Sequence, residues 1–209
     1  MAIPSRQIGW GTESNLLWQI LKQLNKLTSV LFGLKEAATP NYKVYTALLT
    51  QSGGDNPATT NSGELTIGGT YTIDDNSGGL DVTNLGSPNN NIGTSFVVID
   101  STGIGIPNNW GTGVLSYNTG APVATVLENT IGNIWFNYED IGIYGCQSND
   151  LFTTSKTFIS ATPTSDTSTV SIVITNQFES VTYISPLNNS LGAFDNGLYN
   201  SPIEIRVYN

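Results

Sequence analysis

The spacing of apolar residues changes from a helical to a strand period near Pro40, and this change most constrains how the chain can fold. Residues 15–34 read NLLWQILKQLNKLTSVLFGL, with apolar residues three and four positions apart, as in an amphipathic helix. From Tyr42 onward the apolar residues form short runs bounded by Gly, Asn, Asp and Pro. Such runs are typical of antiparallel strands joined by tight turns. We therefore expect one helix within residues 14–34 and a mainly β remainder.

The strand-like runs predict an antiparallel β-sandwich or a barrel-like body. They read YKVYTALLT, ELTIGGTYTIDD, TSFVVID, APVATVLENT, GNIWFNYE, GIYG, KTFISAT, STVSIVITN, SVTYISP and PIEIRVYN. Between two of these runs, Asn196-Gly197 indicates a tight turn, because both residues tolerate positive φ.

The chain is expected to divide into an N-terminal attachment and oligomerisation segment, residues 1–40, and a β body, residues 41–209. Residues 54–118 are richest in Gly, Asn and Asp and separate YTALLTQSG from GAPVATVLENT. They are interpreted as an inserted lobe with short strands of its own. One continuous sheet with long loops explains the same pattern equally well.

The helix has the heptad pattern of a short coiled coil. Leucine at a with isoleucine at d favours trimers or tetramers over dimers, although two of the three d positions hold leucine, which weakens the preference. The alternative is that the apolar face packs on the chain's own β body. The predicted oligomerisation seam comprises Leu17, Ile20, Leu24, Leu27, Leu31 and Leu34.

Charge and cysteine content exclude several classes of function. The net charge is -9 and the pI about 4.1, so the body would repel phosphate backbones and nucleic-acid binding is not expected. Lys22 and Lys26 make the helix too polar to span a bilayer. The start of the sequence shows no secretory signal, and Cys146 is the only cysteine. We therefore expect synthesis in a reducing cytoplasm and no membrane association.

No residue pattern points to catalysis or to a cofactor. The chain has no histidine, which removes histidine-based triads and zinc sites. Asp100 precedes a Thr-Gly pair, where a strand-ending turn is the better interpretation. Residues 74–81 resemble the start of a calcium loop, but Leu85 stands where an EF-hand needs glutamate. The pair Glu139-Asp140 alone does not define a hydrolase site.

Trp110, in PNNWGTG, is the best candidate for a ligand-facing aromatic side chain in an exposed loop. An aromatic ring offers an apolar face on which a sugar can stack. The plain alternative is that this ring belongs to a core.

Several phrases of the sequence resemble modules of virion proteins from phages of Bacteroidetes bacteria. They are IPSRQIGWGTESNLLWQILKQLNKLT, YKVYTALLTQSG, GAPVATVLENTIG and NSPIEIRVYN. The stretch GGTYTIDDNSGGLDVTNLGSPNNNIGTSFVVIDSTGIGIPNNWGTG resembles another such module, spliced between phrases that are otherwise neighbours.

The resemblance implies a non-enzymatic virion appendage, such as a head fibre, a vertex spike or a tail-associated protein. Its implied partners are further copies of the same chain and capsid, vertex or tail proteins, and its implied location is the virion. A receptor-binding module that recognises host surface glycans is the second hypothesis, and a depolymerase is a distant third.

Overall fold

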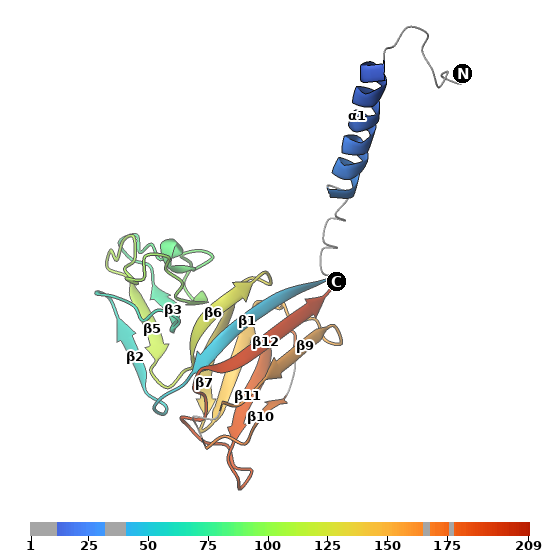
Figure 1. Ribbon diagram of the computed structural model, residues 1–209. Coiled ribbons are helices and arrows are strands. Elements are labelled where there is room, and N and C mark those ends of the chain that lie inside the picture. The colour runs from blue at the N-terminus through green and yellow to red at the C-terminus, as the bar shows by residue number, and fades with distance from the viewer. Residues whose placement is uncertain (1–11, 32–40, 165–167, 176–177) are drawn as a thin grey trace. The chain divides into compact units, whose positions relative to one another are not determined.

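The computed structural model describes residues 12–31, 41–164, 168–175 and 178–209. The chain divides into two units, Met1–Pro40 and Asn41–Asn209, and each is described here by itself. The expected mainly β architecture is confirmed, because the strands form three antiparallel sheets. The described part of the first unit is one helix, α1 (Thr12–Leu31), as Figure 1 shows. The helix overlaps the expected region, residues 14–34, but begins two residues earlier.

The first sheet joins both ends of the β unit. Its strands, in spatial order, are β6 (Val123–Asn129), β1 (Tyr42–Thr50), β12 (Ser201–Tyr208) and β9 (Thr157–Ala161). Strand β1 alternates strictly, so that Tyr45, Ala47 and Leu49 point to one side and are buried. At its start, the Asn209 N–H donates to the Asn41 carbonyl at 3.2 Å. The unit therefore begins and ends on two neighbouring central strands, at the same end of the sheet.

The second sheet packs on the buried side of the first. Its strands are β10 (Ser171–Thr175), β11 (Val181–Leu187), β8 (Ile143–Ser148) and β7 (Ile134–Asp140). Side chains from both sheets form one hydrophobic core, in which Tyr45 and Ile205 of the first sheet meet Phe136, Tyr144 and residues around them. The two sheets appear as two layers in Figure 1.

The third sheet lies between β1 and β6 in the sequence. Its strands are β2 (Pro57–Thr60), β5 (Val114–Asn118), β3 (Thr70–Asp75) and β4 (Ser95–Val97), and a short 3-10 helix, η1 (Thr83–Leu85), follows β3. It has a second hydrophobic core of its own. These buried residues are Leu65, Tyr71, Ile73, Leu80, Val82, Leu85, Phe96, Val98 and Leu115.

Residues 57–118, called the lobe below, interrupt what would otherwise be a hairpin. Thr50 at the end of β1 pairs with Val123 at the start of β6, so the lobe leaves and re-enters the first sheet between two neighbouring antiparallel strands. At its base, Gly68 donates its N–H to the Val98 carbonyl, and Gly68 O accepts from the Ala124 N–H. The first bond lies within the lobe, and the second attaches the lobe to the start of β6.

Candidate functional site

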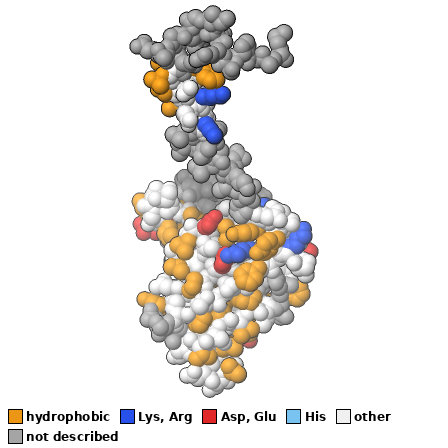
Figure 2. Space-filling model, turned by 45° about the vertical axis from the view of Figure 1, so that its right-hand side comes forward, with side chains coloured by type: hydrophobic (Ala, Val, Ile, Leu, Met, Phe, Trp, Pro, Cys, Tyr) orange, Lys and Arg blue, Asp and Glu red, His pale blue; other side chains and the backbone are white. Residues whose placement is uncertain are grey.

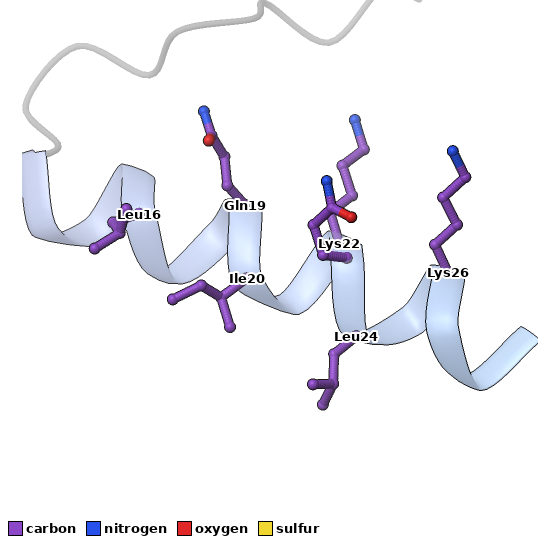
Figure 3. Close-up of a pocket in the computed structure, with 7 residues that line it drawn as sticks. Leu16, Gln19, Ile20, Lys22, Leu24 and Lys26 are labelled. Atoms are coloured by element: carbon purple, nitrogen blue, oxygen red, sulfur yellow. The ribbon is translucent and has the colours of Figure 1, made fainter. Parts of the chain in front are cut away.

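The helix presents an apolar face that the described part of the chain leaves exposed. Leu17, Ile20 and Leu24 of the predicted seam are 64%, 53% and 59% exposed. Figure 3 shows Leu16, Ile20 and Leu24 on one side of the helix. An isolated helix of this kind gains most of its stability from packing of its apolar face, so this face is a candidate contact surface.

The opposite side of the helix is polar. Gln19, Lys22 and Lys26 point away from the leucines in Figure 3. The Lys22 ammonium lies 4.4 Å from the centroid of the Trp18 ring, a cation–π contact along one turn of helix. The helix is therefore amphipathic over its described side chains, as the sequence predicts.

The rest of the predicted seam is only partly within the described structure. Leu27 and Leu31 belong to α1, but their side chains lie outside the described residues, and Leu34 lies outside them altogether. The seam as a set of six contacts remains a prediction.

Trp110 is half-buried and packs against the core of the lobe. Its indole N–H donates to the Gly63 carbonyl at 3.1 Å. The ring therefore holds together two loops of the lobe. This contact favours the structural interpretation of Trp110, although part of the ring stays accessible.

Asp100 accepts hydrogen bonds from its own loop. Asp100 accepts from the Thr102 hydroxyl at 2.7 Å, from the Thr102 N–H at 2.8 Å and from the Gly105 N–H at 2.9 Å. These donors lower the pKa of Asp100 to about 2, the Thr102 hydroxyl contributing most. The turn expected after this strand is confirmed, and the carboxylate stabilises it.

Asp81 has the same role in the loop that resembles a calcium site. The Thr83 hydroxyl donates to it at 2.6 Å, and Asn90 and Asn108 donate their side-chain amides. The Thr83 hydroxyl is the largest cause that lowers the pKa of Asp81 to about 2. Within the described residues, no group of three or more acidic or cysteine side chains is placed to hold a metal ion.

A polar cluster joins the base of the lobe to the two-sheet body, and sequence reasoning missed it. Gln51 follows β1, Asp195 lies in the loop before β12, and Tyr138 and Tyr144 come from β7 and β8. The Tyr144 hydroxyl lies 2.6 Å from Gln51 Oε1 and 3.2 Å from Asp195 Oδ1, and the Tyr138 hydroxyl lies 3.0 Å from Asp195 Oδ2. Backbone groups complete it, since the Gly142 N–H donates to Asp195 Oδ1 at 2.9 Å.

The chemistry of this cluster is structural. Burial, reinforced by the Asp195 carboxylate, raises the pKa of Tyr144, and burial likewise raises that of Tyr138. Both phenols therefore stay protonated and act as donors at neutral pH. Gln51 Nε2 also donates to the Gly53 and Gly120 carbonyls, one on each connection to the lobe. Through these hydrogen bonds the cluster holds both chain connections of the lobe against the two-sheet body.

Two remaining features carry little chemistry. A groove of about 240 Å³ between lobe and body is lined mainly by apolar residues, among them Val97, Ile99 and Val126. Cys146 is buried in the main core, and this burial raises the pKa of its thiol, which disfavours the reactive thiolate.

Comparison with known protein families, with curated proteins and with solved structures found no match. The described part of the chain contains no helix that is long and apolar enough to cross a membrane.

Proposed function

We propose that the chain is a non-enzymatic structural protein of a bacteriophage virion, a trimeric appendage of fibre or spike type. Residues 1–40 attach it to the particle and bring three copies together. Residues 41–209 form a β-sandwich that carries the inserted lobe and projects as the body of the appendage. The phrases quoted from the sequence support the virion assignment by resemblance.

The exposed apolar face of α1 is the observation that carries the proposal of self-association. Five large aliphatic side chains are between 53% and 64% exposed on one side of the described part of this helix. Soluble monomers rarely expose contiguous apolar patches of this kind, and such patches mark contact surfaces. Burying one leucine or isoleucine side chain is worth about 1.5–3 kcal/mol. These side chains are Leu16, Leu17, Ile20, Leu21 and Leu24.

Three copies of the helix can cover this apolar face more completely than two. Leu16 and Leu21 lie outside the a and d positions and widen the apolar stripe beyond a two-stranded seam. Leu17 at a with Ile20 at d also favours more than two strands.

Particles of the phage that encodes the chain provide the direct test. We expect mass spectrometry of purified particles to detect the chain, and antibodies against residues 41–209 to label projections on their surface. Particles that lack the chain after complete purification would contradict a virion role.

A glycan-binding module is the second candidate, and exposed aromatic rings favour it. Phe178 is 56% exposed and Tyr199 47%, and such rings can stack on sugars. Binding of the purified protein to host surface polysaccharide, lost in a Phe178→Ala, Tyr199→Ala variant, would support this function. If the protein binds no such polysaccharide, only the structural role remains. Turnover of the same polysaccharide would overturn the proposal that the chain is not an enzyme.

A further inference from the structure

All the basic residues of the β unit lie at one end of its first sheet. Residues 41–209 contain three, Lys43, Lys156 and Arg206. Lys43 of β1 pairs with Val207 of β12, and Val207 pairs in turn with Thr157 of β9. Lys43, Val207 and Thr157 therefore form one row across three neighbouring strands, which are about 4.8 Å apart. Lys43 lies in this row, and Arg206 and Lys156 are each next to a residue of it.

Aromatic side chains lie beside Arg206, on the outer face of the sheet, whereas Lys43 alternates to the other face at the same end. The rings of Tyr42 and Tyr208 have centroids 5.4 Å apart, and the Arg206 guanidinium lies 5.1 Å from the centroid of the Tyr42 ring. Phe158, opposite Arg206 on β9, is 49% exposed, and Tyr208 is 40% exposed. In Figure 2, the Lys and Arg side chains visible on the β unit lie beside hydrophobic and acidic ones in its upper part.

Arg206 is held in a fixed orientation. Its Nε donates to Glu204 Oε1 at 2.6 Å, while the Tyr42 ring covers one side of the guanidinium. Exposed tyrosine, phenylalanine and arginine are the residue types that protein interfaces favour. We call this end of the sheet, with both of its faces, the basic end, defined by Lys43, Lys156, Arg206, Tyr42, Tyr208 and Phe158.

The remainder of the unit is acidic. All but two of the 16 acidic residues of the chain, Glu13 and Glu36, belong to residues 41–209. One acidic residue of this unit, Glu204, pairs with Arg206 at the basic end. Among the described residues, Lys43 and Lys156 form no ion pair within the chain. A surface of this kind attracts an anionic partner, whereas the rest of the unit repels one.

A cyclic trimer needs this combination of surfaces. In a ring of three copies each contact is heterologous, so one patch must meet a different, complementary patch on the next copy. The β unit offers a basic end and an acidic remainder. The basic end also lies where the chain enters the unit, beside Asn41. Helices joined in a trimer hold the attached β units at high effective concentration, so weak contacts between them become populated.

We propose that the basic end docks on an acidic surface of the β unit of a neighbouring copy. This proposal rests on the proposed trimer and names the second contact that holds it together. The aromatic rings supply apolar contact area, and the two lysines supply orientation and electrostatic attraction.

A neutralised variant with a matched control tests the electrostatic part. Lys43→Gln with Lys156→Gln removes two positive charges from the basic end. Asn61→Asp with Asn91→Asp changes the net charge by the same amount at exposed positions of the lobe. In low salt we expect the first variant to weaken the trimer about tenfold in sedimentation experiments, and the control to leave it unchanged. Added salt should weaken the wild-type trimer and hardly affect the neutralised variant, because salt screens such contacts.

Phe158→Ser tests the aromatic part. We expect a comparable loss of association that does not depend on salt, with an unchanged urea midpoint for unfolding, because Phe158 is half exposed in the single chain. Zero-length cross-linking of the wild type should join Lys43 or Lys156 to carboxylates of another copy.

The outcomes distinguish the docking of the basic end from the proposed trimer on which it rests. A wild-type chain that is monomeric overturns both. A trimer that Leu24→Asp disrupts, but that the lysine variant and salt leave intact, overturns only the docking of the basic end. Binding of dextran sulfate to the intact trimer that is lost in the lysine variant overturns it as well, because the basic end would then be free to take an external anion.

Discussion

The Tyr144 hydroxyl donates to Gln51 Oε1 at 2.6 Å, across 93 residues of the chain. Tyr144 belongs to β8 of the second sheet, and Gln51 follows β1 of the first. The bond therefore links the two layers at the point where the chain leaves for the lobe. Gln51 is buried and part of the same polar cluster as Asp195.

Tyr144→Phe should lower the free energy of unfolding by about 1–2 kcal/mol. The change removes one buried donor but leaves Gln51 Oε1 the Asn196 N–H and Asp195 the Tyr138 hydroxyl, so no acceptor is stranded and the cost stays near that of one hydrogen bond. Urea unfolding measures it. The control Tyr199→Phe makes the same chemical change on an exposed ring and should stay within about 0.5 kcal/mol of wild type. Equal effects of the two changes would contradict the role of the cluster.

The β unit should lose stability as the pH falls from about 4 to 2. The folded pKa of Asp81 and of Asp100 is lowered from 3.8 to about 2, so in this window the unfolded chain binds more protons than the folded chain. The stabilisation is fully present above the unfolded pKa and is lost as the pH falls through the folded value. Urea midpoints measured across this range would show the decline.

Asp81→Asn with Asp100→Asn should flatten that decline, because the substituted side chains no longer titrate. Ser101→Ala, next to Asp100 and exposed, is the control and should keep the wild-type slope. An unchanged slope in the double variant would show that other groups cause the acid sensitivity.

Gly142→Ala should destabilise the chain more than an alanine at another glycine with positive φ. Gly142 has φ 61, and a Cβ there would collide with the backbone nitrogen of Phe194. Gly93 has φ 85 with nothing within 4 Å of the same position. Strain alone costs about 1–2 kcal/mol, which we expect for Gly93→Ala. Gly142→Ala adds the clash and should cost about 3 kcal/mol or more. Similar losses of unfolding free energy in the two variants would mean that the loop before β12 shifts to make room for the added Cβ.

Strands with strict alternation were predictable from sequence. In β1, Tyr45, Ala47 and Leu49 point inward, and the expected run YKVYTALLT matches the observed strand. Strands β2 and β5 were not predicted, because β2 reads PATT and β5 has one fully buried apolar residue, Leu115. Their place is fixed by pairing with each other, which no local pattern expresses.

The run ELTIGGTYTIDD is predicted to alternate on both sides of a break at Gly68-Gly69, and only the part after the break forms a strand. Strand β3 begins only at Thr70. Gly68 has φ 79 and a Cβ there would collide with the Ala124 carbonyl, so the chain turns at this point against β6. Leu65 is still buried in the core of the lobe, but from a loop.

The polar cluster at the base of the lobe had no usable signal in the sequence. Gln51, Tyr144 and Asp195 come from three distant segments, and each is an ordinary polar residue near a strand end. Only the tertiary structure brings them together. The helix is the opposite case, because its amphipathic period is local and the sequence alone predicted it.

The mass of the purified chain in solution tests the central claim most directly. We expect sedimentation of the full chain to give three times its mass of 22.3 kDa. Leu24→Asp should give smaller species, because it places a carboxylate in the apolar face of every copy, where desolvation and like-charge repulsion oppose association. Gln19→Asp adds the same charge on the polar side of α1 and should remain trimeric. A wild-type chain that sediments as a monomer, or a Leu24→Asp variant that stays trimeric, would contradict assembly through the helix.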